Sequence, residues 1–240
     1  MALAHSPKII TDSLVLGFDV RNPKCYPGSG TTISNLGKLN LSDTISGFSV
    51  VEDSDGAGSV LDLRDGPNDQ FDFNNLHTTS HKINKFDWTM QCWIRRREIP
   101  ASNYRAIWLI HTTDDTGNGF YFSMDTRTTT DNHLLAYTRN DNVAGYPTLV
   151  VMTASEFAKN EWNNVALVME AESRWKVYLN AKLVNTITGS DLDERGELIK
   201  RVQIRNGNGC NTNHFLFYEK ALTQNEILQN YNAQKSRYGR

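Results

Sequence analysis

The chain has 240 residues, of which 39% are hydrophobic and 22% charged, and its formal net charge is −2. This composition supplies a normal hydrophobic core and excludes global disorder. The near-neutral charge gives no electrostatic basis for binding nucleic acid or an anionic membrane. The length suits one large β-sandwich or two small domains, and no shift in composition marks a boundary.

The cysteines and the N-terminus indicate a protein that folds in a reducing compartment. Cys25, Cys92 and Cys210 are odd in number and widely spaced, and no CxxC pair exists. A structural zinc site is therefore not expected, and free thiols are. Met1–Pro7 lacks a basic region followed by an apolar core, and no apolar run approaches the roughly 20 residues that span a bilayer. We expect a soluble protein folded in a cytoplasm.

Alternating apolar and polar residues predict many short strands. In Trp88–Arg95, Met90 and Cys92 point to one side, so Trp93 lies on the opposite sheet face or at a subunit contact. Clusters of Asp, Asn, Gly and Pro separate the strands. In chain order the predicted strands are Leu14–Val20, Val60–Leu63, Gln70–Phe73, Trp88–Arg95, Arg105–Ile110, Gly119–Asp125, Leu134–Arg139, Asn164–Met169, Trp175–Asn180, Val202–Arg205 and Asn213–Tyr218.

Polar segments rich in Gly, Ser and Thr are interpreted as long loops. Pro23–Gly47 and Thr126–Asp131 have this composition. Leu149–Met152 is a further candidate strand, and Ser155–Ala158 is a candidate for a single helical turn. The chain has no internal repeat and no low-complexity segment.

The C-terminal region predicts a buried strand that leads into a well-capped helix. Thr223 suits the N-cap, and Glu226 three residues later completes a capping box. Leu222 and Ile227 are spaced to form a hydrophobic staple around the cap. The tail Gln234–Arg240 is polar and basic. It is expected to be a solvated terminus, with a contact arm for a neighbouring subunit as the alternative.

Many short strands with one clear helix predict an all-β fold. The architecture expected is a two-sheet antiparallel sandwich with one short C-terminal helix. We expect residues 1–12 to form an N-terminal arm, residues 13–233 a single domain and residues 234–240 a polar tail.

The order and spacing of five segments resemble the concanavalin A-like lectin/glucanase superfamily, in the laminin-G-like jelly-roll form often found in bacteriophage structural proteins. The resemblance covers nearly the whole chain and implies a concanavalin A-like jelly roll. Its segments are Leu14–Asp19 with Asn22–Lys24 and Tyr26–Thr32, then Leu61–Leu63 with Asp65–Asp69, then Phe86–Ile94, then Trp162–Leu167 with Trp175–Asn180, and finally Phe215–Tyr231.

One position departs from that resemblance. The family usually has Asn-Gly at the hairpin after the central strand, whereas this chain has Asn180-Ala181. A type I′ turn needs positive φ at both central residues, which Gly adopts readily. The departure therefore predicts a longer hairpin loop.

The sequence offers no convincing pair of catalytic acids. The enzymes of this fold retain configuration and need two carboxylates about 5–5.5 Å apart. The candidates are Glu170 with Glu172, in an expected turn, and Asp191 with Asp193 and Glu194, in a polar loop. Neither set lies in an alternating strand, so we expect solvated loop acids and no enzymatic activity.

No cofactor is expected, and calcium is the alternative. Calcium binds several oxygen ligands that converge from loops, and Asp53–Gly56 and Asp114–Asn118 contain suitable residue types. Such loops also serve as ordinary turns in β-proteins. The six histidines show no metal-ligand spacing, and no Gly-x-Ser-x-Gly motif or phosphate-binding loop is present.

Four aromatic residues are candidates for stacking on sugar rings. These are Trp93, Tyr104, Tyr121 and Tyr146. The alternative for each is packing within the domain or in an oligomer interface.

Two hypotheses follow. The first is a non-enzymatic virion structural protein, such as a capsid decoration, head-fibre or tail-associated subunit. It would be made in the host cytoplasm, form a homo-oligomer and contact other virion proteins. The second is a carbohydrate-binding module that attaches to host-surface glycans. Neither involves nucleic acid or a membrane.

Overall fold

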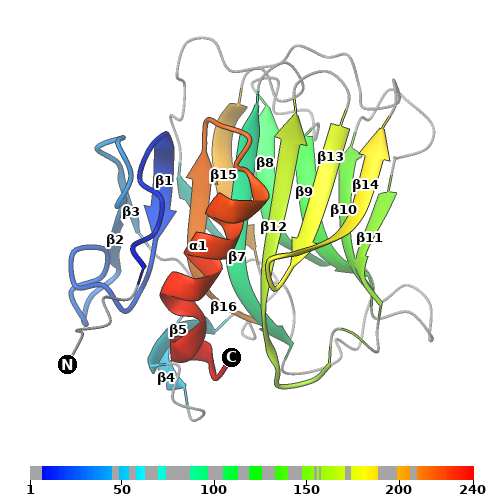
Figure 1. The fold of residues 1–240 in the computed structure, drawn as a ribbon. Coiled ribbons are helices and arrows are strands. Elements are labelled where there is room, and N and C mark those ends of the chain that lie inside the picture. Colours follow the sequence, from blue (N-terminus) through cyan, green and yellow to red (C-terminus); the bar gives the residue numbers. More distant parts are fainter. Residues whose placement is uncertain are drawn as a thin grey trace, which may run out of the picture.

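Two antiparallel sheets lie face to face, and one helix packs on the outside of the larger sheet (Figure 1). The computed structural model describes residues 7–44, 49–53, 58–62, 70–73, 87–96, 105–112, 119–125, 133–139, 148–153, 156, 158–170, 174–188, 199–205 and 210–240. The all-β sandwich with a short C-terminal helix predicted from the sequence is confirmed. No helix in these ranges is long and apolar enough to cross a membrane.

The larger sheet has eight strands. Its order is β14 (Lys182–Thr188), β13 (Arg174–Leu179), β12 (Trp162–Glu170), β7 (Trp88–Arg96), β16 (Cys210–Tyr218), β5 (Gly58–Asp62) and β4 (Ser49–Asp53), with β1 (Leu14–Phe18) also pairing with β16. One edge of β16 is therefore shared, since Asn211 and Thr212 pair with β5 and Phe215–Tyr218 pair with β1.

The smaller sheet has six strands in the order β11 (Thr148–Met152), β10 (His133–Arg139), β9 (Gly119–Asp125), β8 (Arg105–Thr112), β15 (Ile199–Arg205) and β6 (Gln70–Phe73). A separate two-stranded ribbon joins β2 (Thr32–Ser34) to β3 (Ser42–Thr44). This ribbon lies within a region that we expected to be a long loop. The polar composition of this region hid the two strands. Strands β4 and β14 were also not predicted.

Strand alternation divides the side chains of the larger sheet between two hydrophobic layers. Met90, Cys92 and Ile94 of β7 face the smaller sheet, where Val202 of β15 joins the same cluster. The alternate residues point outward and pack beneath the helix. Ala166, Val168, Leu216 and Tyr218 form this outer layer with Leu222 and Ile227. Strands β7 and β12 are thus buried on both faces.

The helix α1 (Gln224–Gln234) begins as the sequence predicts. The Thr223 hydroxyl accepts from the Glu226 backbone N–H at 3.3 Å, and the Glu226 carboxylate accepts from the Thr223 N–H at 2.8 Å. The capping box is therefore complete. Leu222 and Ile227 are buried in one cluster, as the staple prediction requires.

Polar side chains beneath α1 form a continuous chain of hydrogen bonds. The Asn230 amide donates to Gln91 at 2.8 Å, and Gln91 donates to Asn164 at 2.8 Å. Asn230 also donates to the Tyr218 hydroxyl at 3.1 Å and accepts from the Ile10 backbone N–H at 2.7 Å. Because buried polar groups are costly without partners, this network fixes the position of the helix on the sheet. It also holds the N-terminal arm against the helix.

The hairpin from β13 to β14 differs from the prediction. Leu179 pairs directly with Lys182, so the turn has two residues, Asn180 at φ 50° and Ala181 at φ 64°. The predicted longer loop is therefore wrong. The Asn180 side chain accepts from the Asn164 backbone N–H at 3.0 Å and donates to Asn163 at 3.0 Å. These contacts, with burial of the Ala181 methyl group, hold Ala181 in a conformation that usually favours glycine.

Replacing Thr223 by Ala removes the hydroxyl that caps α1. We expect Thr223→Ala to lower the free energy of unfolding by about 1 kcal/mol, because one backbone N–H of the first turn loses its acceptor. Urea denaturation measures this change. Thr223→Ser is the matched control, since it keeps the hydroxyl and is expected to retain most of the stability. Equal losses in both variants would contradict the capping role.

Candidate functional site

The C-terminal segment, residues 234–240, folds back onto the outer face of the larger sheet. It contains the 3₁₀ helix η1 (Lys235–Tyr238). The Tyr238 ring stacks on Trp93 with centroids 4.1 Å apart and planes 14° apart, and Tyr231 stacks at 5.6 Å. The prediction that this segment is a solvated tail is therefore wrong. Its aromatic ring supplies the apolar surface that holds it down.

Trp93 is on the sheet face opposite Met90 and Cys92, as its alternation predicts, but it is not available to a ligand. Its side chain is 0% exposed, and its indole N–H donates to Gln234 Oε1 at 2.7 Å. We correct the prediction that Trp93 offers an open surface for a sugar ring. The sequence pattern gives the face of a strand but not what covers it.

An ion pair joins the C-terminal segment to the turn that follows β1. The Arg237 guanidinium donates to both oxygens of Asp19, at 2.9 and 3.0 Å. Burial by itself would raise the pKa of the Asp19 carboxyl, but the Arg237 hydrogen bonds and nearby positive charge hold that pKa below its usual value. Two-oxygen contacts of this kind are the geometrically specific form of ion pair. This contact links residues 218 positions apart in the chain.

The contact between Gln234 and His214 requires a neutral histidine. An indole N–H can only donate, so Gln234 turns its oxygen to Trp93 and its Nε2 to His214 Nε2, 2.9 Å away. The histidine nitrogen must then accept. Burial lowers the pKa of His214 to about 4, with Asp19 acting in the opposite direction. His214 is thus a neutral buried acceptor near neutral pH.

A buried charged layer lies beside this aromatic stack. The Arg95 guanidinium forms an ion pair with Asp53, and both side chains are buried. The Trp162 indole N–H donates to the other Asp53 oxygen at 3.3 Å, and Arg95 lies 4.8 Å from the Trp162 ring centroid. This geometry is a cation–π contact. Asp53, which was named in a candidate calcium loop, is therefore bonded to cationic and neutral donors.

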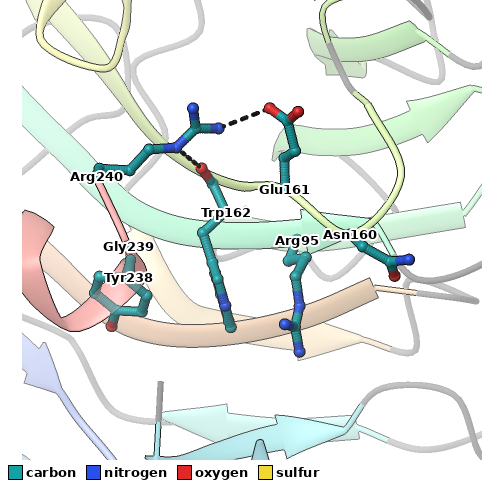
Figure 2. Close-up of a pocket in the computed structure, with 7 residues that line it drawn as sticks. All are labelled: Arg95, Asn160, Glu161, Trp162, Tyr238, Gly239 and Arg240. Carbon is teal, nitrogen blue, oxygen red and sulfur yellow. Dashed lines mark hydrogen bonds and ion pairs between the residues drawn. The ribbon is translucent and has the colours of Figure 1, made fainter. Parts of the chain in front are cut away.

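The C-terminal segment and the start of β12 enclose a pocket of about 360 Å³ (Figure 2). We call it the C-terminal pocket. The Arg240 guanidinium forms one side of it, donating to the Trp162 carbonyl at 2.8 Å and to the Glu161 carboxylate at 3.0 Å. Asn160 lies on the opposite side in Figure 2. The described lining residues are Arg95, Asn160, Glu161, Trp162, Tyr238, Gly239 and Arg240.

Backbone geometry orients Asn160. It has φ 67°, a left-handed conformation that Asn tolerates better than most residues. Its backbone N–H donates to the Arg96 carbonyl at 2.7 Å, beside the bridge between Arg96 and Lys159. The end of β7 thus places Asn160 at the pocket, and its side-chain amide makes no hydrogen bond with the described residues.

The pocket offers hydrogen bonding but no pair of acids. Glu161 is the only residue with a side-chain carboxylate among the described lining residues. Within the described ranges, no group of three or more His, Cys, Asp and Glu residues is placed to hold a metal ion. The arrangement can bind a polar ligand through a guanidinium, a carboxylate and an amide.

The other candidate site residues from the sequence lie away from the pocket or outside the described residues. Tyr121 belongs to β9, and its side chain is outside the described part of the structure, as are the residues Tyr104 and Tyr146. These three stay predictions. Glu170 ends β12 and pairs with Lys176 and with Arg174, the latter at 3.5 Å. The acids Glu172, Asp191, Asp193 and Glu194 and the loop residues 54–56 and 114–118 lie outside the described residues.

The pocket is not predictable from the sequence because three of its lining residues, Tyr238, Gly239 and Arg240, are in the segment interpreted as a tail. The available signal was Tyr238, an aromatic residue between Arg237 and Gly239 at the end of an otherwise polar stretch. A solvated tail would expose this apolar ring to water, so the ring indicates a segment that packs on the domain.

Comparisons with known protein families and solved structures agree with this fold. A profile of the concanavalin A-like lectin/glucanases superfamily matches residues 65–228, more than half of the chain. The chain belongs to the concanavalin A-like lectin/glucanase superfamily. The resemblance inferred from the sequence is thereby confirmed. A search of curated proteins found no match.

Solved structures share the superfamily fold at low sequence identity. The receptor-binding domain of botulinum neurotoxin D matches with a TM-score of 0.71 and 15% identity, over 93% of this chain and 53% of that one. The same toxin's ligand-binding domain in complex with N-acetylneuraminic acid matches with a TM-score of 0.69 and 17% identity, over 94% and 52%. The binding domain of Paraclostridial Mosquitocidal Protein 1 matches with a TM-score of 0.68 and 15% identity, over 92% and 52%. The chain studied spans about half the length of the structures it matches.

The buried His214 predicts acid sensitivity. Its folded pKa of about 4 is below the unfolded value of 6.5, so the unfolded chain takes up the proton first. The stability that neutral His214 contributes is present above pH 6.5 and is lost as the pH falls toward 4. Asp19, whose pKa is also lowered, adds a further loss at more acidic pH. Urea denaturation at pH 7 and pH 4.5 should show a loss on the order of 2 kcal/mol from His214.

His214→Asn is the test variant. His214 has φ 59°, which Asn tolerates, and Asn does not titrate. The variant is expected to lose clearly less stability than the wild type between the two pH values. An equal loss in both proteins would show that His214 does not carry this acid sensitivity.

Proposed function

We propose that this domain is a non-enzymatic recognition module that binds carbohydrate. The observation that carries the proposal is the C-terminal pocket of a lectin-like fold, where Asn160, Glu161 and Arg240 line the same hollow as Trp162 and Tyr238. Pockets that bind small ligands combine a partly apolar lining with a few polar groups that fix orientation. Sugar hydroxyls are recognised by such groups because each hydroxyl both donates and accepts.

The fold neighbours support the class of ligand. One of them is a toxin ligand-binding domain in complex with N-acetylneuraminic acid, and others are receptor-binding domains. A binding role is also consistent with the single side-chain carboxylate among the described lining residues, because hydrolysis with retention needs two acids flanking the scissile bond. The proposed module therefore holds a glycan without cleaving it.

A second proposal concerns where the module acts. We infer a structural role in a bacteriophage virion, as a decoration, head-fibre or tail-associated subunit that is made in the host cytoplasm and assembles as a homo-oligomer. The opening segment that resembles phage domains supports this role. Two exposed apolar residues on the edge strand β14 also support it, Leu183 at 46% and Val184 at 45% exposure. Exposed apolar groups on an edge strand suit contact with another subunit. The two roles are compatible in one protein.

Glycan-array binding tests the first proposal. The purified protein is expected to bind a defined subset of glycans and to release no reducing sugar from the bound ones during prolonged incubation. Heat-unfolded protein is the control for non-specific adhesion. Absence of specific binding would overturn the recognition role, and release of sugar would overturn the non-enzymatic one.

Light scattering tests the structural proposal. The expected result is a closed oligomer, and Leu183→Lys with Val184→Lys is expected to shift it toward monomer, because charged side chains on an edge strand oppose association. Leu228→Lys, which changes an apolar residue exposed by 42% on α1, is the matched control. A wild-type monomer would contradict the homo-oligomer.

A further inference from the structure

The charges that line the C-terminal pocket are already paired. Arg240 contacts Glu161 at 3.0 Å, and Arg95 pairs with Asp53 within the buried layer below. Each positive side chain thus has a negative partner, and the described lining side chains carry no unbalanced charge toward a ligand. An ionised ligand would lose its hydration and meet no net opposite charge.

Several hydrogen-bonding atoms in the pocket have no partner among the described residues. They include both donors and acceptors. Arg240 Nη1 and Asn160 Nδ2 are donors, while Glu161 Oε1 and Asn160 Oδ1 are acceptors, and none of the hydrogen bonds in the described residues uses them. A ligand that fits must therefore donate and accept at several points at once.

We propose that the C-terminal pocket binds an uncharged sugar ring in preference to an acidic sugar. A neutral pyranose satisfies the mixed donors and acceptors through its hydroxyls, and it needs no counter-charge. The volume of about 360 Å³ is near the lower end of the range for ligand pockets, which suits one ring rather than a long oligosaccharide. This inference rests on the proposed recognition function and names its site and ligand class.

Asn160 and Glu161 are the residues that contact this sugar. Asn160 offers an amide that binds two neighbouring hydroxyls. The Glu161 side chain is 54% exposed, and its second oxygen faces no described partner. Arg240, 30% exposed, is held in place by three hydrogen bonds to Glu161, Trp162 and Asn163. The guanidinium thus stays fixed while the amide and carboxylate are available.

The first variant is Asn160→Gly. Glycine adopts the φ of 67° without strain, so the change removes the amide and preserves the turn. Titration of ¹⁵N-labelled protein with free galactose, glucose, N-acetylglucosamine and N-acetylneuraminic acid measures affinity. The Asn160 side-chain amide and Trp162 indole signals report the site in the wild type. We expect an uncharged sugar to bind and Asn160→Gly to weaken it about fivefold to tenfold.

The second variant, Glu161→Gln, tests the selectivity. It removes the charge that balances Arg240, so the pocket gains net positive charge. We expect this variant to gain affinity for N-acetylneuraminic acid, in a manner that added salt suppresses. Asp12→Asn is the matched control, because Asp12 is 77% exposed and pairs with Lys220 at 3.5 Å away from the pocket lining. It should leave both affinities unchanged.

The outcomes separate the site from the function. If the wild type binds uncharged sugars but neither Asn160→Gly nor Glu161→Gln changes that binding, the pocket is not the site, although the recognition function stands. Stronger binding of N-acetylneuraminic acid by the wild type, weakened by Asn160→Gly, would overturn the selectivity. If none of the four sugars shifts any signal and the glycan array is also negative, the inference and the proposed function both fail.

Discussion

The stacking of Tyr238 on Trp93 is the contact on which the outer layer of this protein depends. It brings the end of the chain onto the central strand β7, where a large aromatic side chain would otherwise face water. Burial of two aromatic rings is the apolar driving force, since such rings contribute most of the energy of cores and interfaces. The Arg237–Asp19 ion pair then fixes the direction of the segment and joins it to the start of the sheet. The C-terminal pocket exists because this segment is docked.

The same arrangement explains why central strands of the sheet carry polar residues on a buried face. Thr89, Gln91 and Asn164 are buried, and each bonds to a neighbouring group, with Thr89 accepting from Leu222 N–H and donating to the Lys220 carbonyl. Each hydrogen bond of this kind adds little net stability, but a buried polar group without a partner costs free energy. The bonds therefore select a single position for the helix. Apolar area holds the layer together, and polar contacts determine its register.

Local patterns predicted much of this fold from the sequence, and long-range contacts account for what they missed. The alternation in β7 and the capping box at Thr223 depend on neighbouring residues, so both were predictable. The tight turn at Ala181 was not, because Asn163 and Asn164 stabilise it from another strand. The docked C-terminal segment was not predictable either, because Asp19 and Trp93 lie far from it in the chain. The candidate pocket depends on those contacts, so periodicity pointed instead to Trp93, which the segment covers.

Hydrogen exchange of the backbone amides in α1 and the C-terminal segment tests this account most directly. The account predicts that the amides from Ile227 to Tyr238 exchange slowly, with protection close to that of β16, because the segment opens only with the layer that it covers. The amides at Gln224 and Asn225, at the helix N-terminus, should exchange faster, since the first N–H groups of a helix have no intrahelical partner. Rapid exchange from Lys235 to Tyr238, at the rate of an unstructured chain, would contradict the docked segment and the pocket it forms.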